Sequence, residues 1–138
     1  MSNTKTPLNF DTGKLTQEQI EGVFESLPVD ITFVDKDNQV QYFNNYTTRI
    51  FKRPKTVIGR KVQNCHPKHS LHAVNKILKE FTAGERDVAE FWIELDGRMI
   101  HIRYFPVYNQ QEEYLGCLEV SQDITAIQEL SGEKRLLD

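Results

Sequence analysis

The sequence predicts an α+β fold, with antiparallel strands in its second half and helices ahead of them. Two runs, Asp87–Leu95 and Arg98–Val107, alternate apolar and polar residues around Asp96-Gly97, which is the strongest short signal for a β-hairpin. A third alternating run leads into Asp123-Ile124-Thr125, where Asp or Thr can cap a following helix. Further upstream, between Leu71 and Phe81, apolar residues recur with the spacing of a helix.

Length and composition indicate one ordinary globular domain. The 138 residues suffice for one hydrophobic core, and the hydrophobic share of 38% and charged share of 27% are typical of soluble proteins. The formal net charge is −3 without a basic block, so no nucleic-acid partner is expected. No apolar run approaches the roughly 20 residues of a membrane span, and residues 1–11 lack a signal-peptide core. Cys65 and Cys117 form no CxxC pair, so we expect free thiols and a cytoplasmic location.

The N-terminal part divides into a disordered tail, residues 1–14, and a capping helix, residues 15–26. The tail is expected because its first residues are polar and show no clear period. The helix is expected because Thr16 can cap it and Gln19, three residues on, can close a capping box. Pro28 then ends the helix.

Two strands and several helical pieces follow. Val29–Val34 and Gln39–Phe43 are β-type runs around the turn-forming tetrad Asp35-Lys36-Asp37-Asn38, so we expect them to be neighbours in one sheet. Residues 44–62 loosen into short helical pieces. A longer helix is predicted over Pro67–Phe81, because proline suits the first turn and an apolar stripe follows it.

The Asp96-Gly97 turn fixes the register of the later hairpin, and one of its faces is apolar. The predicted pairs on this face are Ile93 with Ile100, Phe91 with Ile102, and Ala89 with Tyr104. The other face pairs Trp92 with His101 and Glu90 with Arg103. Trp92 lies near Val88 and Phe105 there, which predicts a contact patch for the N-terminal helix or a second subunit.

Residues 125–138 are predicted to form a C-terminal signalling helix. Thr125 with Gln128 reads as a capping box, and Ile127, Leu130 and Leu137 fit a short heptad seam that Gly132 weakens. A helix that folds back on the sheet is the alternative.

The order of these elements, with the residues that they carry, resembles a PAS domain. The resemblance covers residues 27–124 and rests on Leu27–Asp35, Val40–Asn44, Ile58-Gly59-Arg60, Gly116 and the closing Asp123-Ile124-Thr125. It implies a PAS fold, in which short helices flank a five-stranded antiparallel sheet and enclose a cavity. The stretch Ile58–Pro67 resembles more closely a bacterial subfamily in which the PAS domain lies C-terminal to a domain of unknown function and a hemerythrin-like domain. Whether the chain is a full-length protein or a fragment stays open.

The segment Cys65–His72 holds three histidines and a cysteine, which are ligands for haem iron or zinc. The resemblance makes haem the leading candidate cofactor, with His66 and His72 as its ligands. The alternatives are a metal site, or a loop histidine at 66 followed by exposed histidines. Five further side chains are expected to face the cavity or to be plain core: Phe33, Tyr42, Phe91, Ile102 and Tyr104.

No nucleophile with a base and no argued carboxylate pair stands out, so an enzyme is not expected. The leading hypothesis is a ligand-sensing regulatory module that binds a small molecule or cofactor and relays this through the sheet and the terminal helix. The alternative is a protein-interaction module without a cofactor. A homodimer through the outer sheet face and the N-terminal helix is expected, together with an effector protein or a missing effector domain.

Overall fold

The computed structural model describes residues 3–46 and 48–138 and confirms the α+β PAS-type architecture. A five-stranded antiparallel sheet has the order β4-β3-β7-β6-β5. It is built, in chain order, from β3 (Asp30–Asp35), β4 (Val40–Phe43), β5 (Ala89–Leu95), β6 (Arg98–Tyr108) and β7 (Tyr114–Asp123). The last strand along the chain is therefore the middle strand of the sheet.

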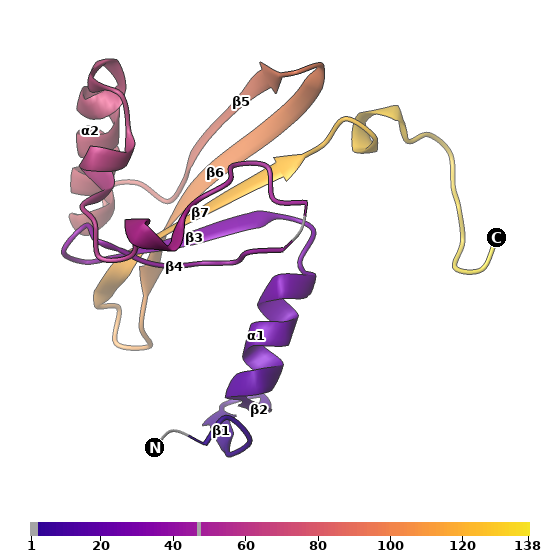
Figure 1. Cartoon of the computed structure of the whole chain (residues 1–138), viewed down its shortest axis with the longest axis horizontal. Coiled ribbons are helices and arrows are strands. Elements are labelled where there is room, and N and C mark those ends of the chain that lie inside the picture. Colours follow the sequence, from indigo (N-terminus) through magenta and orange to yellow (C-terminus); the bar gives the residue numbers. More distant parts are fainter. Residues whose placement is uncertain (1–2, 47) are drawn as a thin grey trace.

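The two α-helices of the described residues lie differently relative to this sheet (Figure 1). Helix α2 (Leu71–Thr82) packs against the sheet, and three single-turn 3-10 helices precede it at Lys55–Val57, Val62–Cys65 and Lys68–Ser70. Helix α1 (Gln17–Ser26) instead projects away from the sheet, and none of its residues is buried. Within the described ranges neither helix, of 10 and 12 residues, offers a run long and apolar enough to cross a membrane.

The predicted hairpin registers are confirmed. Asp96 (φ 50°) and Gly97 (φ 79°) both have positive φ, as a tight two-residue turn between twisted strands requires. The turn sets the β5–β6 pairs Ile93–Ile100, Phe91–Ile102 and Ala89–Tyr104. Strands β3 and β4 are neighbours in the sheet, as predicted, and pair antiparallel.

The start of α1 is confirmed in detail. Thr16 Oγ1 accepts a hydrogen bond from the Gln19 backbone N–H at 3.0 Å, and Gln19 Oε1 accepts one from the Thr16 backbone N–H at 3.0 Å. These two bonds satisfy donors that the first turn of a helix leaves unpaired.

The prediction of a disordered tail over residues 1–14 is wrong for most of that segment, of which residues 1–2 lie outside the described part. Strands β1 (Pro7–Phe10) and β2 (Gly13–Thr16) pair antiparallel in a separate two-stranded sheet that leads into α1. The physical reason is the alternation of Leu8 and Phe10 before the Asp11-Thr12 turn, after which Gly13 opens β2 with a φ of 144° that favours glycine.

The prediction of a helix over residues 125–138 is also wrong. Only Ile127–Glu129 forms a single 3-10 turn, and the chain beyond it runs away from the sheet (Figure 1). Thr125 does not cap a helix: its Oγ1 donates to Asp123 Oδ1 at 2.6 Å and accepts from the Met99 backbone N–H at 2.9 Å. A short helix needs a packing partner, and Leu137 is 100% exposed.

The two faces of the large sheet differ. The inner face carries Val34, Cys117 and other core side chains, and packs against Leu78 and Phe81 of α2. The outer face is opposite to it and carries Phe33 and Trp92, since successive residues of a strand point to opposite sides. The inner face and α2 therefore enclose the core and the cavity described next.

Candidate functional site

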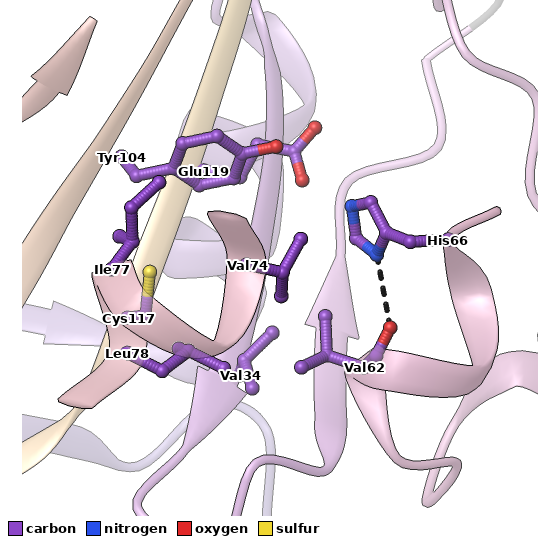
Figure 2. Close-up of a pocket in the computed structure, with 9 residues that line it drawn as sticks. All are labelled: Val34, Val62, His66, Val74, Ile77, Leu78, Tyr104, Cys117 and Glu119. Carbon is purple, nitrogen blue, oxygen red and sulfur yellow. Dashed lines mark hydrogen bonds between the residues drawn. The ribbon is translucent and has the colours of Figure 1, made fainter. Parts of the chain in front are cut away.

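A cavity lies between α2 and the inner face of the sheet (Figure 2). Its apolar walls come from the sheet, from α2 and from the 3-10 helix Val62–Cys65, and consist of Val34, Val62, Val74, Ile77 and Leu78. Four polar side chains complete it: His66, Tyr104, Cys117 and Glu119. An apolar enclosure with a few converging polar groups is typical of small-molecule sites.

Strand register explains how the polar groups meet. Glu119 of β7 lies opposite Tyr104 of β6 and opposite Thr32 of β3, so the carboxylate stands at the centre of the inner face. Cys117, two residues earlier on β7, points to the same side.

Burial keeps two of these groups neutral. Burial, and after it the nearby Glu119 carboxylate, raise the pKa of the Cys117 thiol to about 12. Burial, followed by the negative charge of Glu119, also raises the pKa of the Tyr104 phenol well above its usual range. Tyr104 therefore offers the cavity a neutral hydroxyl.

Glu119 forms an ion pair with Arg53. Arg53 Nη2 lies 3.5 Å from Glu119 Oε1, and the two side chains are only 20% and 14% exposed. Arg53 Nε is buried and has no hydrogen-bond partner among the residues that the structure describes. The guanidinium thus keeps a donor that no described group uses.

His66 follows the 3-10 helix Val62–Cys65, and its side chain lines the cavity. Its Nδ1 lies 3.0 Å from the Val62 carbonyl oxygen. Because a carbonyl oxygen only accepts, Nδ1 carries the proton in this contact, and the other ring nitrogen is turned toward the cavity (Figure 2). This geometry holds the imidazole in one orientation.

The structure brings some of the predicted site residues together at the cavity. His66 and Tyr104 line it. Ile102 is buried on the same face of β6, and the Phe91 ring stacks on that of Tyr104 with centroids 5.9 Å apart, but neither lines the cavity. His72 is exposed on α2 and is not part of the cavity wall.

The placement of Phe33 and Tyr42 toward the cavity is wrong. Val34 lines the cavity, so its neighbour Phe33 points to the outer face, and Tyr42 pairs with Phe33 across the strands. The Tyr42 ring lies 5.7 Å from that of Phe24 and so meets α1. Both faces of β3 carry apolar side chains, and this hides the correct side from the sequence pattern.

Haem does not fit this site. The cavity volume is about 40 Å³, whereas pockets for ligands of drug or cofactor size measure about 300–1,000 Å³. His72 lies outside the cavity, and the described ranges hold no cluster of three or more His, Cys, Asp or Glu arranged to bind a metal ion.

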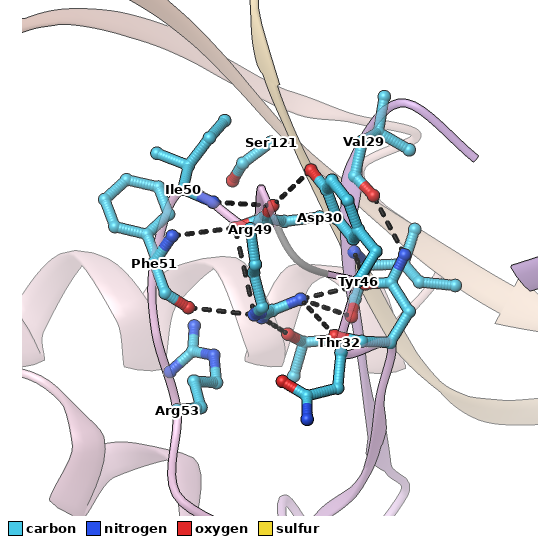
Figure 3. Close-up of polar contacts among 12 residues, drawn as sticks. Val29, Asp30, Thr32, Tyr46, Arg49, Ile50, Phe51, Arg53 and Ser121 are labelled. Atoms are coloured by element: carbon cyan, nitrogen blue, oxygen red, sulfur yellow. Dashed lines mark hydrogen bonds and ion pairs between the residues drawn. The ribbon is translucent and has the colours of Figure 1, made fainter. Parts of the chain in front are cut away.

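A buried polar cluster that the sequence analysis missed lies beside the cavity (Figure 3). The Arg49 side chain is 1% exposed and lies 3.9 Å from Asp30 Oδ2. Its nitrogens also donate to the Phe51 carbonyl oxygen at 2.8 Å and to Thr32 Oγ1 at 3.0 Å. Asp30 in turn accepts a hydrogen bond from the Tyr46 hydroxyl at 2.7 Å, so this buried ion pair is well compensated.

Asn44 ties this cluster to α1. Its Oδ1 accepts from Arg49 Nη1 at 2.8 Å, and its Nδ2 donates to the carbonyl oxygen of Phe24, in the last turn of α1, at 3.0 Å. Asn44 and Arg49 thus link the end of α1 to Thr32, which lies opposite Glu119 in the sheet. Only tertiary packing brings these groups together, so no local sequence signal could have found them.

Comparisons with known proteins agree with this architecture. The family model described as "PAS domain" matches residues 20–125. The crystal structure of a C-terminal domain from Streptococcus mutans is 34% identical, with a TM-score of 0.87, and the match covers 94% of this chain and 100% of that one.

More distant structures share the fold alone. The PAS domain of BvgS from Bordetella pertussis is 18% identical, with a TM-score of 0.55 and coverage of 79% of this chain and 86% of that one. A sensory box sensor histidine kinase from Vibrio cholerae is 12% identical, with a TM-score of 0.55 and coverage of 79% and 91%. No curated protein matches the chain.

Proposed function

The chain belongs to the PAS domain family, and from this premise we propose that it is a regulatory sensing module that binds a small molecule between α2 and the sheet. The cavity supports this proposal most directly. It combines apolar walls with a carboxylate, a phenol and an oriented imidazole, from Glu119, Tyr104 and His66. Such a set can select one small ligand by shape and by a few hydrogen bonds. We propose no catalytic role.

The site also suggests how binding is relayed. A ligand that disturbs the 3.5 Å contact between Glu119 and Arg53 acts beside Thr32, which lies opposite Glu119 and accepts a hydrogen bond from Arg49. Arg49 binds Asn44, and Asn44 holds α1 through the Phe24 carbonyl oxygen. Since α1 has no buried residue, a small change in this anchor can alter its position. We therefore propose relay through the sheet and α1, in place of a C-terminal helix.

Native mass spectrometry of freshly purified protein tests the sensing proposal. We expect the wild-type chain to carry a small bound mass, and Val74→Phe to lose it because the larger ring fills the cavity. Val88→Phe is the matched control, since Val88 is 41% exposed and lies outside the cavity wall. A mass that persists in Val74→Phe, or a wild-type chain that is bare after extraction from several growth conditions, would contradict the proposal.

A second candidate function is a protein-interaction module that forms a homodimer through the outer face and α1. It is favoured by Trp92, which is 63% exposed on the outer face, and by the unburied helix α1. Light scattering should then give a dimer mass that Trp92→Glu lowers and that Gln111→Glu, in an exposed loop, leaves unchanged. A monomer in all three proteins would exclude this function.

The wider setting remains a proposal as well. The Streptococcus mutans structure is described as a C-terminal domain. We propose that the present chain likewise acts with further domains, namely a domain of unknown function and a hemerythrin-like domain, or with a separate effector protein. The free thiols of Cys65 and Cys117 support a cytoplasmic location.

A further inference from the structure

We infer that a basic groove beside the cavity binds the carboxylate of a small monocarboxylic acid, whose short apolar chain reaches past His66 into the cavity. This inference rests on the proposed sensing function and names the chemical class of the ligand.

The groove follows the chain between residues 52 and 67. Its volume is about 470 Å³, and Lys52, Arg53 and Arg60 are among the residues that line it. Of the nine described residues in its wall none is acidic, although the chain as a whole has more acidic than basic residues, 20 against 17. A cleft lined by one sign of charge concentrates ligands of the opposite sign. The groove therefore favours an anion.

The wall chemistry favours a carboxylate over a phosphate. Guanidinium groups such as Arg53 and Arg60 can bind a carboxylate or a phosphate through two parallel hydrogen bonds. Phosphate sites usually add several backbone N–H groups, but Pro54 and Pro67 in this wall have none. Arg53 Nε is buried and has no hydrogen-bond partner among the described residues, so the Arg53 guanidinium keeps an unmet donor that an anion entering beside Glu119 would satisfy.

The adjoining cavity sets the size of the rest of the ligand. His66 lines both the groove and the cavity, so the two spaces share a wall. The cavity volume of about 40 Å³ corresponds to roughly three groups of the size of water, at about 10–15 Å³ each. A methyl or methylene group is of similar size. A chain of three carbon atoms, as in butyrate, therefore matches the space.

Glu119 competes with the ligand carboxylate for the Arg53 guanidinium. Its carboxylate already lies 3.5 Å from Arg53, so an incoming carboxylate must share or take over this guanidinium. Removing the negative charge of Glu119 should then strengthen binding of the anion. A cationic or neutral ligand held by Glu119 would show the opposite response.

The experiment is a calorimetric or NMR titration of the full chain with butyrate at constant ionic strength. Acetate, butyramide, butylamine and inorganic phosphate serve as comparison probes. We expect butyrate to bind more tightly than all four. Arg53→Gln and Arg60→Gln should each lower the affinity for butyrate about tenfold or more, because each substitution removes a hydrogen bond from a charged donor. Lys36→Gln, which removes an exposed cation in the Asp35–Asn38 turn, should change nothing.

Two further variants decide the geometry. Glu119→Gln should strengthen butyrate binding severalfold. Val74→Phe should weaken the binding of butyrate but leave the binding of acetate unchanged, because acetate has no chain that reaches the cavity. Unchanged acetate binding also shows that this variant is folded. Equal binding of butylamine or butyramide, tighter binding of phosphate, weaker binding to Glu119→Gln, or no effect of Val74→Phe on butyrate would each overturn the inference.

The titration separates this inference from the proposed function. If native mass spectrometry finds a bound mass that Val74→Phe removes while butyrate does not bind, the sensing cavity stands and the carboxylate assignment fails. If butyrate binds as expected, both stand.

Discussion

Asn44→Ala should lower the free energy of unfolding by about 4 kcal/mol. Asn44 is fully buried, and its side-chain amide makes four hydrogen bonds. Oδ1 accepts from the Ile31 N–H and from Arg49, each at 2.8 Å, and Nδ2 donates to the carbonyl oxygens of Phe24 at 3.0 Å and Val29 at 2.9 Å. Three neutral bonds at about 0.5–1.5 kcal/mol each and one bond to a charged group at about 1.5–3 kcal/mol give about 3–7.5 kcal/mol together, and the expected loss lies in the lower half of this range.

Urea unfolding followed by circular dichroism measures the loss. A domain of ordinary stability, about 5–15 kcal/mol, would remain folded, with its Tm lowered by about 15 °C and its urea m-value unchanged. Asn45→Ala is the control: Asn45 is exposed, and its backbone N–H, which the substitution keeps, donates to the Glu25 carboxylate at 2.9 Å. The control should change stability by less than about 0.5 kcal/mol.

Amide hydrogen exchange adds a local observable. In Asn44→Ala the amides of α1 should lose protection before those of the sheet, because the Phe24 carbonyl oxygen loses its donor. A loss of stability below about 1.5 kcal/mol, or equal losses in the Asn44 and Asn45 variants, would refute the role given to this amide.

Three further predictions concern the core and the cavity. Gly116→Ala should cost about 3 kcal/mol or more in urea unfolding, because φ is 153° there and a Cβ would overlap the Val34 carbonyl oxygen. Phe81→Ala should cost about 3–5 kcal/mol, because the side chain is fully buried, and a smaller loss would show that the core collapses around it. Between pH 9 and 12 the unfolded thiol of Cys117, with an ordinary pKa of 9.0, loses its proton while the folded thiol, with a pKa of about 12, keeps it. Stability should therefore fall with rising pH by about 1.4 kcal/mol per unit more than in Cys117→Ala, and parallel pH profiles would contradict this.

The sequence predicted those parts of the fold that local chemistry decides. Asp96-Gly97 allows one tight turn, so the register of β5 and β6 followed from it. Thr16 and Gln19 likewise marked the start of α1. The predicted helix over residues 125–138 failed because no packing partner covers its apolar side chains, and partners are not visible in a local pattern.

The candidate site was less accessible to sequence reasoning. His66 and Tyr104 were found, but Glu119 was missed although it lies opposite Tyr104 in the sheet. The order of the strands, which places β7 beside β6 and β3, would have revealed it. Phe33 and Tyr42 were assigned to the wrong side because alternation fixes which residues share a face, and not which face meets α2.

The strand order also determines when the sheet can form during synthesis. Strands β3 and β4, and later β5 and β6, are neighbours along the chain and can pair as soon as they leave the ribosome. Strand β7, the last to be made, must enter between β3 and β6, where Asp30 pairs with Ser121 and Ile102 pairs with the same serine from the other side. Until β7 is inserted, the β3–β4 pair and the β5–β6 pair each have an unpaired edge, on β3 and on β6. Unpaired strand edges are the places where chains aggregate or exchange strands. One late insertion of the middle strand therefore completes the sheet, the cavity wall and the contact between Glu119 and Arg53 together.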